Sequence, residues 1–189
     1  DMASELTVQT LRGPTSGANA DTILIPSGQT LDASNGFVAP AGHVIQTIYS
    51  EYETYGSSTS TSLFAIPVSA TITPKFSNSK ILVTVMLNGV YMNGTQRVVI
   101  TELYKRIDGG SASSVHRFNT TAGYIMAGDE PSYGTYSNVY NYMETAGSTG
   151  SLLYQIYLGQ NSAGTVFWNN YNVLNGDTKS TMVLQEIAQ

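Results

Sequence analysis

Two acidic residues stand at a spacing that could support hydrolysis of a glycosidic bond. Glu51 and Glu53 are separated by one residue in a segment that alternates like a strand, which would place both carboxylates on one face about 7 Å apart. Glycoside hydrolases need two carboxyl groups roughly 5–10 Å apart, one to donate a proton and one to attack or to activate water. Exposed acids are usually only solvated, and the second pair, Asp129-Glu130, sits in a turn flanked by Gly and Pro. Hydrolysis therefore stays an alternative function.

The two histidines, His43 and His116, give little support to metal or triad chemistry. Neither has a second histidine or an acid at the spacing of metal ligands, and any triad would need Ser and Asp partners that a sequence cannot place. One histidine per chain could still ring a metal across a threefold axis. The chain has no cysteine, which excludes disulfides and thiolate ligands. We predict no catalytic residue, no cofactor and no metal.

Tyrosines interleaved with Ser, Asn and Gly give the strongest binding signal in the sequence. Flat rings with a polar edge, next to adaptable amides, suit sugar faces and protein epitopes alike. The alternative is that these rings fill the core or a subunit interface, because the alternation of a strand would turn at least half of them inward. Trp168 is assigned to the core or an interface. The predicted receptor contacts are Tyr133, Tyr136, Asn138, Tyr140, Asn141 and Tyr142.

These residues depend for their positions on a series of predicted strands. Ile81, Val83 and Val85 alternate with polar residues, and this period of two is typical of a half-buried strand. Asn93-Gly94 predicts a two-residue hairpin turn, and no stretch of a dozen residues keeps a helical period. About eight strands predict an all-β, jelly-roll-like antiparallel β-sandwich over residues 40–189. The predicted strands are 44–52, 65–72, 80–91, 96–107, 114–121, 137–144, 152–159, 164–168 and 181–187.

Residues 1–39 differ from the rest of the chain. They hold four short apolar elements, among them Thr22–Ile25, separated by Gly- and Pro-containing breaks. A segment of fewer than about 40 residues cannot bury a core by itself. We predict a short extended segment that intertwines with identical copies, and an ordered linker on the domain surface is the alternative. The predicted trimer-interface residues are Ile23, Ile25, Leu31 and Phe37.

Composition argues against two classes of partner. Only 11% of the 189 residues are charged, against about 25% in an average domain. The net charge is −5, and the eight Lys and Arg residues form no stripe, so nothing would drive nucleic-acid binding by counterion release. No apolar run approaches the ~20 residues of a membrane span. We predict neither nucleic acid nor membrane insertion.

Several segments resemble the fibre proteins of marine tailed phages. Residues 21–34 resemble their shaft-like segment, and residues 41–46, 72–83, 153–170 and 180–188 resemble their distal domain in the expected order. The resemblance implies a virion component, usually a homotrimer, with a slender N-terminal shaft, a C-terminal β-sandwich head and no catalysis. It supplies no binding residue that could be transferred to this chain.

We therefore predict a bacteriophage fibre or tail-tip protein of the virion that binds a host-surface glycan or protein receptor as a homotrimer and contacts other virion proteins. One alternative is a capsid-decorating or collar structural protein, and another is a glycan-hydrolysing tailspike. Because the chain starts without the attachment domain of a long fibre, we expect either a fragment of such a fibre or a small complete one.

Overall fold

The computed structural model describes residues 13–18, 20, 22–29, 39–94, 99–119, 136–160, 163–169 and 178–189. The chain divides into two compact units, residues 1–38 and residues 39–189, and each is described by itself. In these described ranges there is no helix of the length and apolar character needed to cross a membrane.

The described part of residues 1–38 contains turns and segments without regular secondary structure. The N–H of Ala20 donates to the carbonyl of Gly17 at 3.1 Å, and the N–H of Gln29 donates to that of Pro26 at the same distance. The short apolar element Thr22–Ile25 forms no strand, because no second described segment pairs with it. Ile23 and Ile25 are exposed within the single chain. Leu31 and Phe37 lie outside the described residues, so the intertwined interface stays a prediction.

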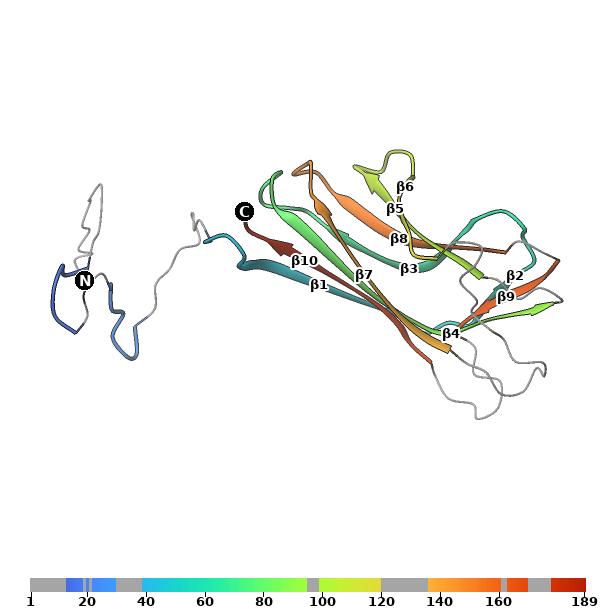
Figure 1. Ribbon diagram of the computed structural model, residues 1–189, viewed down its shortest axis with the longest axis horizontal. Helices are drawn as coiled ribbons and strands as arrows, with labels where there is room; N and C mark the ends of the chain where they lie inside the picture. The colour runs from blue at the N-terminus through green and yellow to red at the C-terminus, as the bar shows by residue number, and fades with distance from the viewer. Residues whose placement is uncertain are drawn as a thin grey trace, which may run out of the picture. The chain divides into compact units, whose positions relative to one another are not determined.

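The described part of residues 39–189 forms ten strands, and all their pairings are antiparallel (Figure 1). Most of them match the strands predicted from alternation, since buried and exposed positions follow one another along each strand. Their bounds are β1 Val44–Tyr52, β2 Gly56–Ser58, β3 Phe64–Ile72, β4 Lys80–Gly94, β5 Val99–Ile107, β6 Ser113–Arg117, β7 Tyr136–Thr145, β8 Leu152–Gln160, β9 Gly164–Trp168 and β10 Ser180–Ile187.

Eight of these strands build a jelly roll. The larger sheet has the order β1-β10-β4-β7 and the smaller sheet the order β3-β8-β5-β6. When β2 and β9 are left out, the other eight strands can be renumbered 1 to 8 along the chain. The two sheet orders then become 1-8-3-6 and 2-7-4-5, which is the double Greek key of a jelly roll. The remaining strands, β2 and β9, pair with each other, and β9 pairs with the last residues of β4. The predicted all-β, jelly-roll-like antiparallel sandwich is confirmed for this unit.

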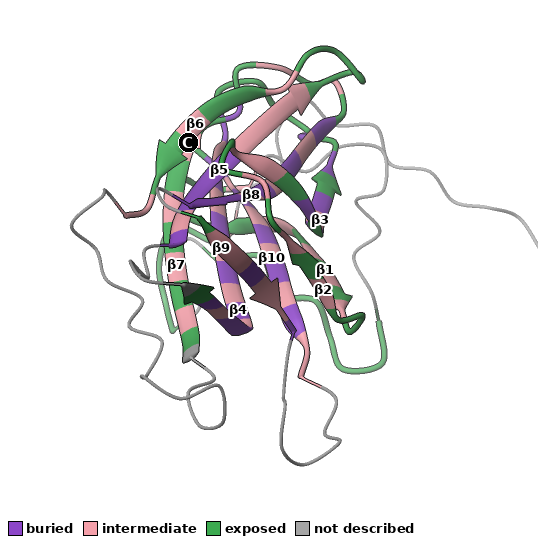
Figure 2. Cartoon of the chain, turned by 90° about the vertical axis from the view of Figure 1, so that its right-hand side faces the viewer, coloured by how far each residue is buried: buried purple, intermediate pink, exposed green. Residues whose placement is uncertain are grey.

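The core lies between the two sheets. Ile81, Val83 and Val85 of β4 are fully buried, as is Leu184 of β10, while the residues between them are partly exposed. Figure 2 shows this alternation as stripes along β4 and β10. Tyr154 and its neighbours on β8 pack into the same core from the smaller sheet. Each large apolar side chain buried in this way stabilises the fold by about 1.5–3 kcal/mol.

The predicted hairpin at Asn93-Gly94 is wrong. Both residues belong to β4, where Asn93 pairs with Thr165 and Gly94 pairs with Gly164 of β9. The next strand, β5, lies in the other sheet, so no described pair joins β4 to β5. A turn is present at Asp108-Gly109, with positive φ angles of 49° and 72° at these two residues.

A buried carboxylate holds one end of the sandwich together. Glu186 of β10 accepts hydrogen bonds from the N–H groups of Lys75 at 2.9 Å and Phe76 at 3.1 Å, and from the amide of Gln46 at 2.6 Å. Burial by itself would raise the pKa of Glu186, but these donors outweigh it and the pKa is lowered. The same end holds His43, whose carbonyl accepts from the N–H of Ala188 at 2.9 Å. We call it the proximal end, and the end formed by β2 and β9 the distal end.

Candidate binding surface

The predicted receptor contacts on β7 are divided between its two faces. Asn138, Tyr140 and Tyr142 are partly buried and alternate with exposed residues, among them Asn141. Asn141 therefore faces away from the tyrosines, as the period of two requires. Tyr136 begins β7, but its side chain lies outside the described residues, as does the whole of Tyr133. The prediction that these six residues contact a receptor is not tested by this arrangement.

The two inward tyrosines join the sheets at one side of the sandwich. The Tyr140 ring stacks on Phe118 with centroids 4.6 Å apart, and Tyr142 stacks on His116 at 4.8 Å. Strands β6 and β7 are edges of different sheets, so this column of rings covers the space between them. Burial raises the pKa of Tyr140. The position of both tyrosines fits the alternative in which the rings pack within the sandwich.

A second group of rings, which the sequence did not reveal, lies at the distal end. Tyr91 of β4 is directly opposite Phe167 of β9, and their rings stack with centroids 4.5 Å apart and an interplanar angle of 13°. Tyr55, just before β2, continues the stack at 6.2 Å from Phe167 and is 52% exposed. We call Tyr55, Phe167 and Tyr91 the distal ladder. Burial is the main cause that raises the pKa of Tyr91.

A buried polar network joins the strands that carry the distal ladder to their neighbours. Asn169, which follows β9, has a positive φ of 51° and is buried. Its amide donates to the carbonyl of Tyr52 at 2.9 Å, and its side-chain oxygen accepts from the hydroxyl of Ser180 at 2.5 Å. Its own N–H donates to the carbonyl of Asn88 at 3.0 Å. A satisfied buried network of this kind rigidifies the strands that carry the rings.

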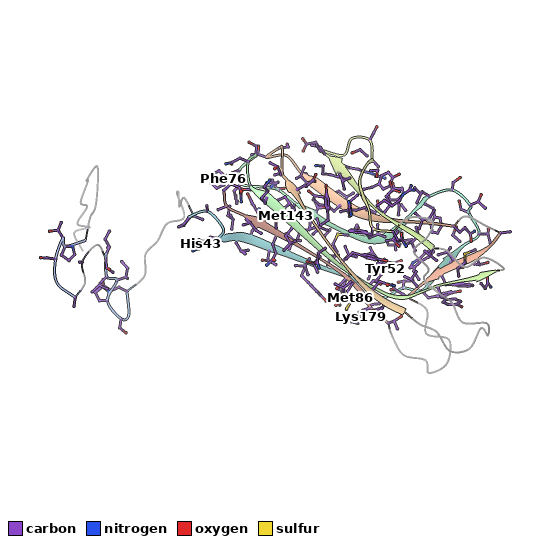
Figure 3. The ribbon with its side chains drawn as sticks, viewed as in Figure 1. His43, Tyr52, Phe76, Met86, Met143 and Lys179 are labelled. Carbon is purple, nitrogen blue, oxygen red and sulfur yellow. The ribbon has the colours of Figure 1, made fainter. Side chains whose placement is uncertain are left out.

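The ladder and the proximal end lie at opposite ends of the same unit. Figure 3 labels His43 and Phe76 at one end, and Figure 1 places β2 and β9 at the other. The rings of the ladder are therefore displayed far from the residues that connect to the N-terminal unit. This arrangement can present aromatic faces to a ligand that approaches the distal end.

The acidic pair considered for hydrolysis is engaged by a lysine. Both Glu51 and Glu53 form ion pairs with Lys179, at 3.4 Å from the ammonium group to Glu51, and all three side chains reach solvent. The hydroxyl of Tyr49 donates to Glu51 at 2.9 Å. That hydrogen bond, followed by Lys179, lowers the pKa of Glu51. A general acid of a glycosidase needs a raised pKa, so the environment of Glu51 does not suit that role.

The remaining candidates for metal or acid–base chemistry lie apart from one another. Glu53 follows the end of β1 and is outside the strand that was expected to align it with Glu51. His43 is exposed, with Nδ1 3.1 Å from the carbonyl of Pro40. Asp129-Glu130 lies outside the described residues. Among the residues that the structure describes, no three His, Asp or Glu side chains are grouped to hold a metal ion.

Comparison with known proteins adds distant structural matches, among them two structures of infectious bursal disease virus. No family model and no curated protein sequence matches the chain significantly. A structure of the infectious bursal disease virus Gx strain matches at 16% identity with a TM-score of 0.37, covering 86% of this chain and 42% of that one. The VP2 subviral particle of infectious bursal disease virus matches at 14% identity with a TM-score of 0.38, covering 93% and 46%. The chain thus spans less than half of either relative, and the fold assignment comes from its own strands.

Proposed function

We propose that this chain is a virion surface protein, a fibre or tail-tip protein of a bacteriophage, that binds a host-surface glycan or protein receptor without catalysis. The observation that carries the proposal is the distal ladder, with the half-exposed Tyr55 stacked beside Phe167 at the end of the sandwich opposite the N-terminal junction. Aromatic faces supply large contact area at small cost in conformational entropy. The resemblance of the sequence to phage fibres supports the same function.

A homotrimer would strengthen this binding. Three copies of one modest site on a single assembly turn the second and third binding events into intramolecular ones, and avidity then exceeds the affinity of a single site by about 10²–10⁴-fold. The exposed Ile23 and Ile25 support association of the N-terminal units, because apolar residues of this kind become buried when copies assemble.

Binding to an immobilised panel of bacterial lipopolysaccharides, capsular polysaccharides and whole outer-membrane protein extracts tests the proposal. We expect a subset of the panel to retain the full chain, and we expect Tyr55→Ala and Phe167→Ala to weaken retention by roughly tenfold or more, the effect of losing an aromatic hot spot. The matched control is Phe76→Ala, which removes an exposed ring at the proximal end. Equal retention of wild type and both ladder variants would overturn the assignment of the ladder.

The two alternative functions have separate readouts. A capsid-decorating protein would bind phage particles stripped of this chain and would not bind host cells. A pull-down of wild type, Tyr55→Ala and Phe167→Ala against stripped particles and against host cells separates the two functions. A tailspike would release reducing ends from host polysaccharide, and Glu51→Gln would abolish that release. Labelling of intact particles with an antibody against this chain, followed by electron microscopy, locates the protein on the virion.

A further inference from the structure

The outward face of the larger sheet carries apolar side chains interspersed with uncharged polar ones, among them the hydrogen-bonded pair Thr84 and Asn141. Residues of adjacent strands meet there in register: Glu51, Thr181, Met86 and Val139 form one row across β1, β10, β4 and β7. The next row is Tyr49, Val183, Thr84 and Asn141, and the row after it is Thr47, Gln185, Leu82 and Met143. We call the surface made by Tyr49, Leu82, Met86, Val139, Met143 and Val183 the outer sheet face.

Several of its side chains are unusually exposed for their type. Val139 is 61% exposed, Tyr49 60% and Met143 49%. Figure 3 shows Met86 and Met143 on the same sheet, and Figure 2 shows the exposed stripes along β7. Exposed apolar side chains gathered on one face, with no charge among them, favour an interaction site.

The outward face of the smaller sheet provides an internal contrast. There, Arg117 donates to the buried carboxylate of Glu102 at 2.8 Å, and Arg106 donates to the hydroxyl of Tyr157 at 3.3 Å. The stacked rings of Tyr104 and Tyr157 lie between these charged groups. The middle of the outer sheet face therefore lacks charged side chains of the kind that lie on the outward face of the smaller sheet.

Charges occur only at two margins of the described outer sheet face. At the distal margin, Glu51 and Glu53 face the single cation Lys179, which leaves a net charge of −1 from two acids and one base. At the proximal margin, Lys80 donates to the hydroxyl of Thr145 at 2.7 Å and supplies a charge of +1. A copy turned end for end would bring its basic margin toward the acidic margin of the first.

The size of the face suits a contact between folded chains. Four strands about 4.8 Å apart, each with about eight residues rising 3.4 Å, cover roughly 500 Å² in projection. Side chains standing on the sheet raise the accessible area toward the ~800 Å² that each partner contributes to a standard interface. Methionine and tyrosine are also enriched at the centres of such interfaces.

We propose that the outer sheet face binds a second copy of this chain, sheet against sheet and end for end. An uncharged centre lets two copies of an acidic protein approach without repulsion, and the margins carry opposite charges that an antiparallel pair matches. This interface is separate from any association of the N-terminal units and from the distal ladder, so it stands whether or not the proposed receptor function holds.

Hydroxyl-radical footprinting of the full chain, read by mass spectrometry, tests the proposal with two tyrosines of the same protein. In a single chain Tyr49 and Tyr55 are similarly exposed, at 60% and 52%. We expect Tyr49 to react several-fold more slowly than Tyr55 at high protein concentration and to reach a similar rate on dilution. Equal reactivity at all concentrations would overturn the proposal, even if the N-terminal units hold the chains together.

Val139→Arg is the matched interface variant, because it places a charge beside Met86 and Met143 on the outer sheet face of each copy. We expect a roughly hundredfold weaker association in analytical ultracentrifugation, since an unpaired charge is buried on each side, and a Tyr49 reactivity equal to that of Tyr55. Thr71→Arg places the same charge on an exposed position of β3, an edge strand of the smaller sheet, and should change neither readout. The proposal would be contradicted if Tyr49 stayed protected in the Val139→Arg variant. It would also be contradicted if the wild-type chain sedimented as a monomer and bound only other virion proteins.

Discussion

The indole of Trp168 lies directly against the backbone of Gly56, its cross-strand partner in the β2–β9 pair. A Cβ atom added to Gly56 would stand 2.0 Å from Cζ2 of the indole, a distance at which no real pair of carbon atoms packs. Trp168 also contacts Phe64 with ring centroids 5.9 Å apart. The absence of a side chain at residue 56 therefore lets the tryptophan anchor the distal strands to the core.

Gly56→Ala should displace Trp168 and loosen the distal ladder. We expect a loss of about 1–3 kcal/mol in the free energy of unfolding, the usual cost of overpacking. Because Trp168 is the only tryptophan of the chain, its fluorescence emission should shift in the folded state. Ser57→Ala, at an exposed position of the same strand, is the control and should leave the emission unchanged. An unshifted spectrum for Gly56→Ala would mean that the close approach is not maintained in solution.

Glu186→Gln should reduce stability at neutral pH and lose its effect in acid. The pKa of Glu186 is lowered in the folded protein, so its contribution is complete above the unfolded pKa of about 4.3 and is lost as pH falls through the lower folded value. Loss of charge-assisted hydrogen bonds should cost about 1.5–3 kcal/mol at pH 7. Urea unfolding at pH 7 and pH 3 measures the difference between wild type and variant, with the exposed Glu53→Gln as control. A difference that stays constant with pH would contradict this account.

Local alternation was enough to predict the strands, but not their partners. Ile81, Val83 and Val85 identify β4 by period alone, whereas the pairing of Tyr91 with Phe167 joins segments that are distant in the chain. The same limit explains the error at Asn93-Gly94, which has the residue types of a hairpin turn but finds a ladder partner in β9. On β7, the period of two already separates Tyr140 from Asn141, and it could have excluded a single surface containing both.

A polar cluster inside the sandwich should contribute more to the free energy of unfolding than exposed ion pairs do. The carboxylate of Glu144 lies 2.6 Å from the ammonium group of Lys105 and accepts a hydrogen bond of 2.6 Å from the buried hydroxyl of Tyr154. Burial and this bond raise the pKa of Tyr154 well above its ordinary range. Glu144→Leu leaves Lys105 buried without its partner and should cost about 3–5 kcal/mol.

A double-mutant cycle separates the ion pair from simple loss of packing. We expect Lys105→Met combined with Glu144→Leu to recover much of the stability lost in the single Glu144 variant, because well-packed apolar residues can replace a buried pair. Thermal unfolding of the four proteins gives the coupling free energy. Additive losses for the two substitutions would show that the groups do not interact in the folded state.

Tyr140→Ala and Asn141→Ala distinguish a packing role on β7 from a receptor contact. Tyr140 stacks on Phe118 across the two sheets, so its removal should lower the free energy of unfolding by about 2–3 kcal/mol, somewhat less than for a fully buried ring. Asn141 is exposed and accepts a hydrogen bond from the hydroxyl of Thr84 at 2.8 Å, so Asn141→Ala should cost at most about 0.5 kcal/mol. Both variants are then measured on the polysaccharide and membrane-protein panel at a temperature where each is folded. If Asn141→Ala lowers retention without a change in stability, the outward face of β7 contacts the receptor. If retention falls only for Tyr140→Ala and together with its stability, Tyr140 has a packing role alone.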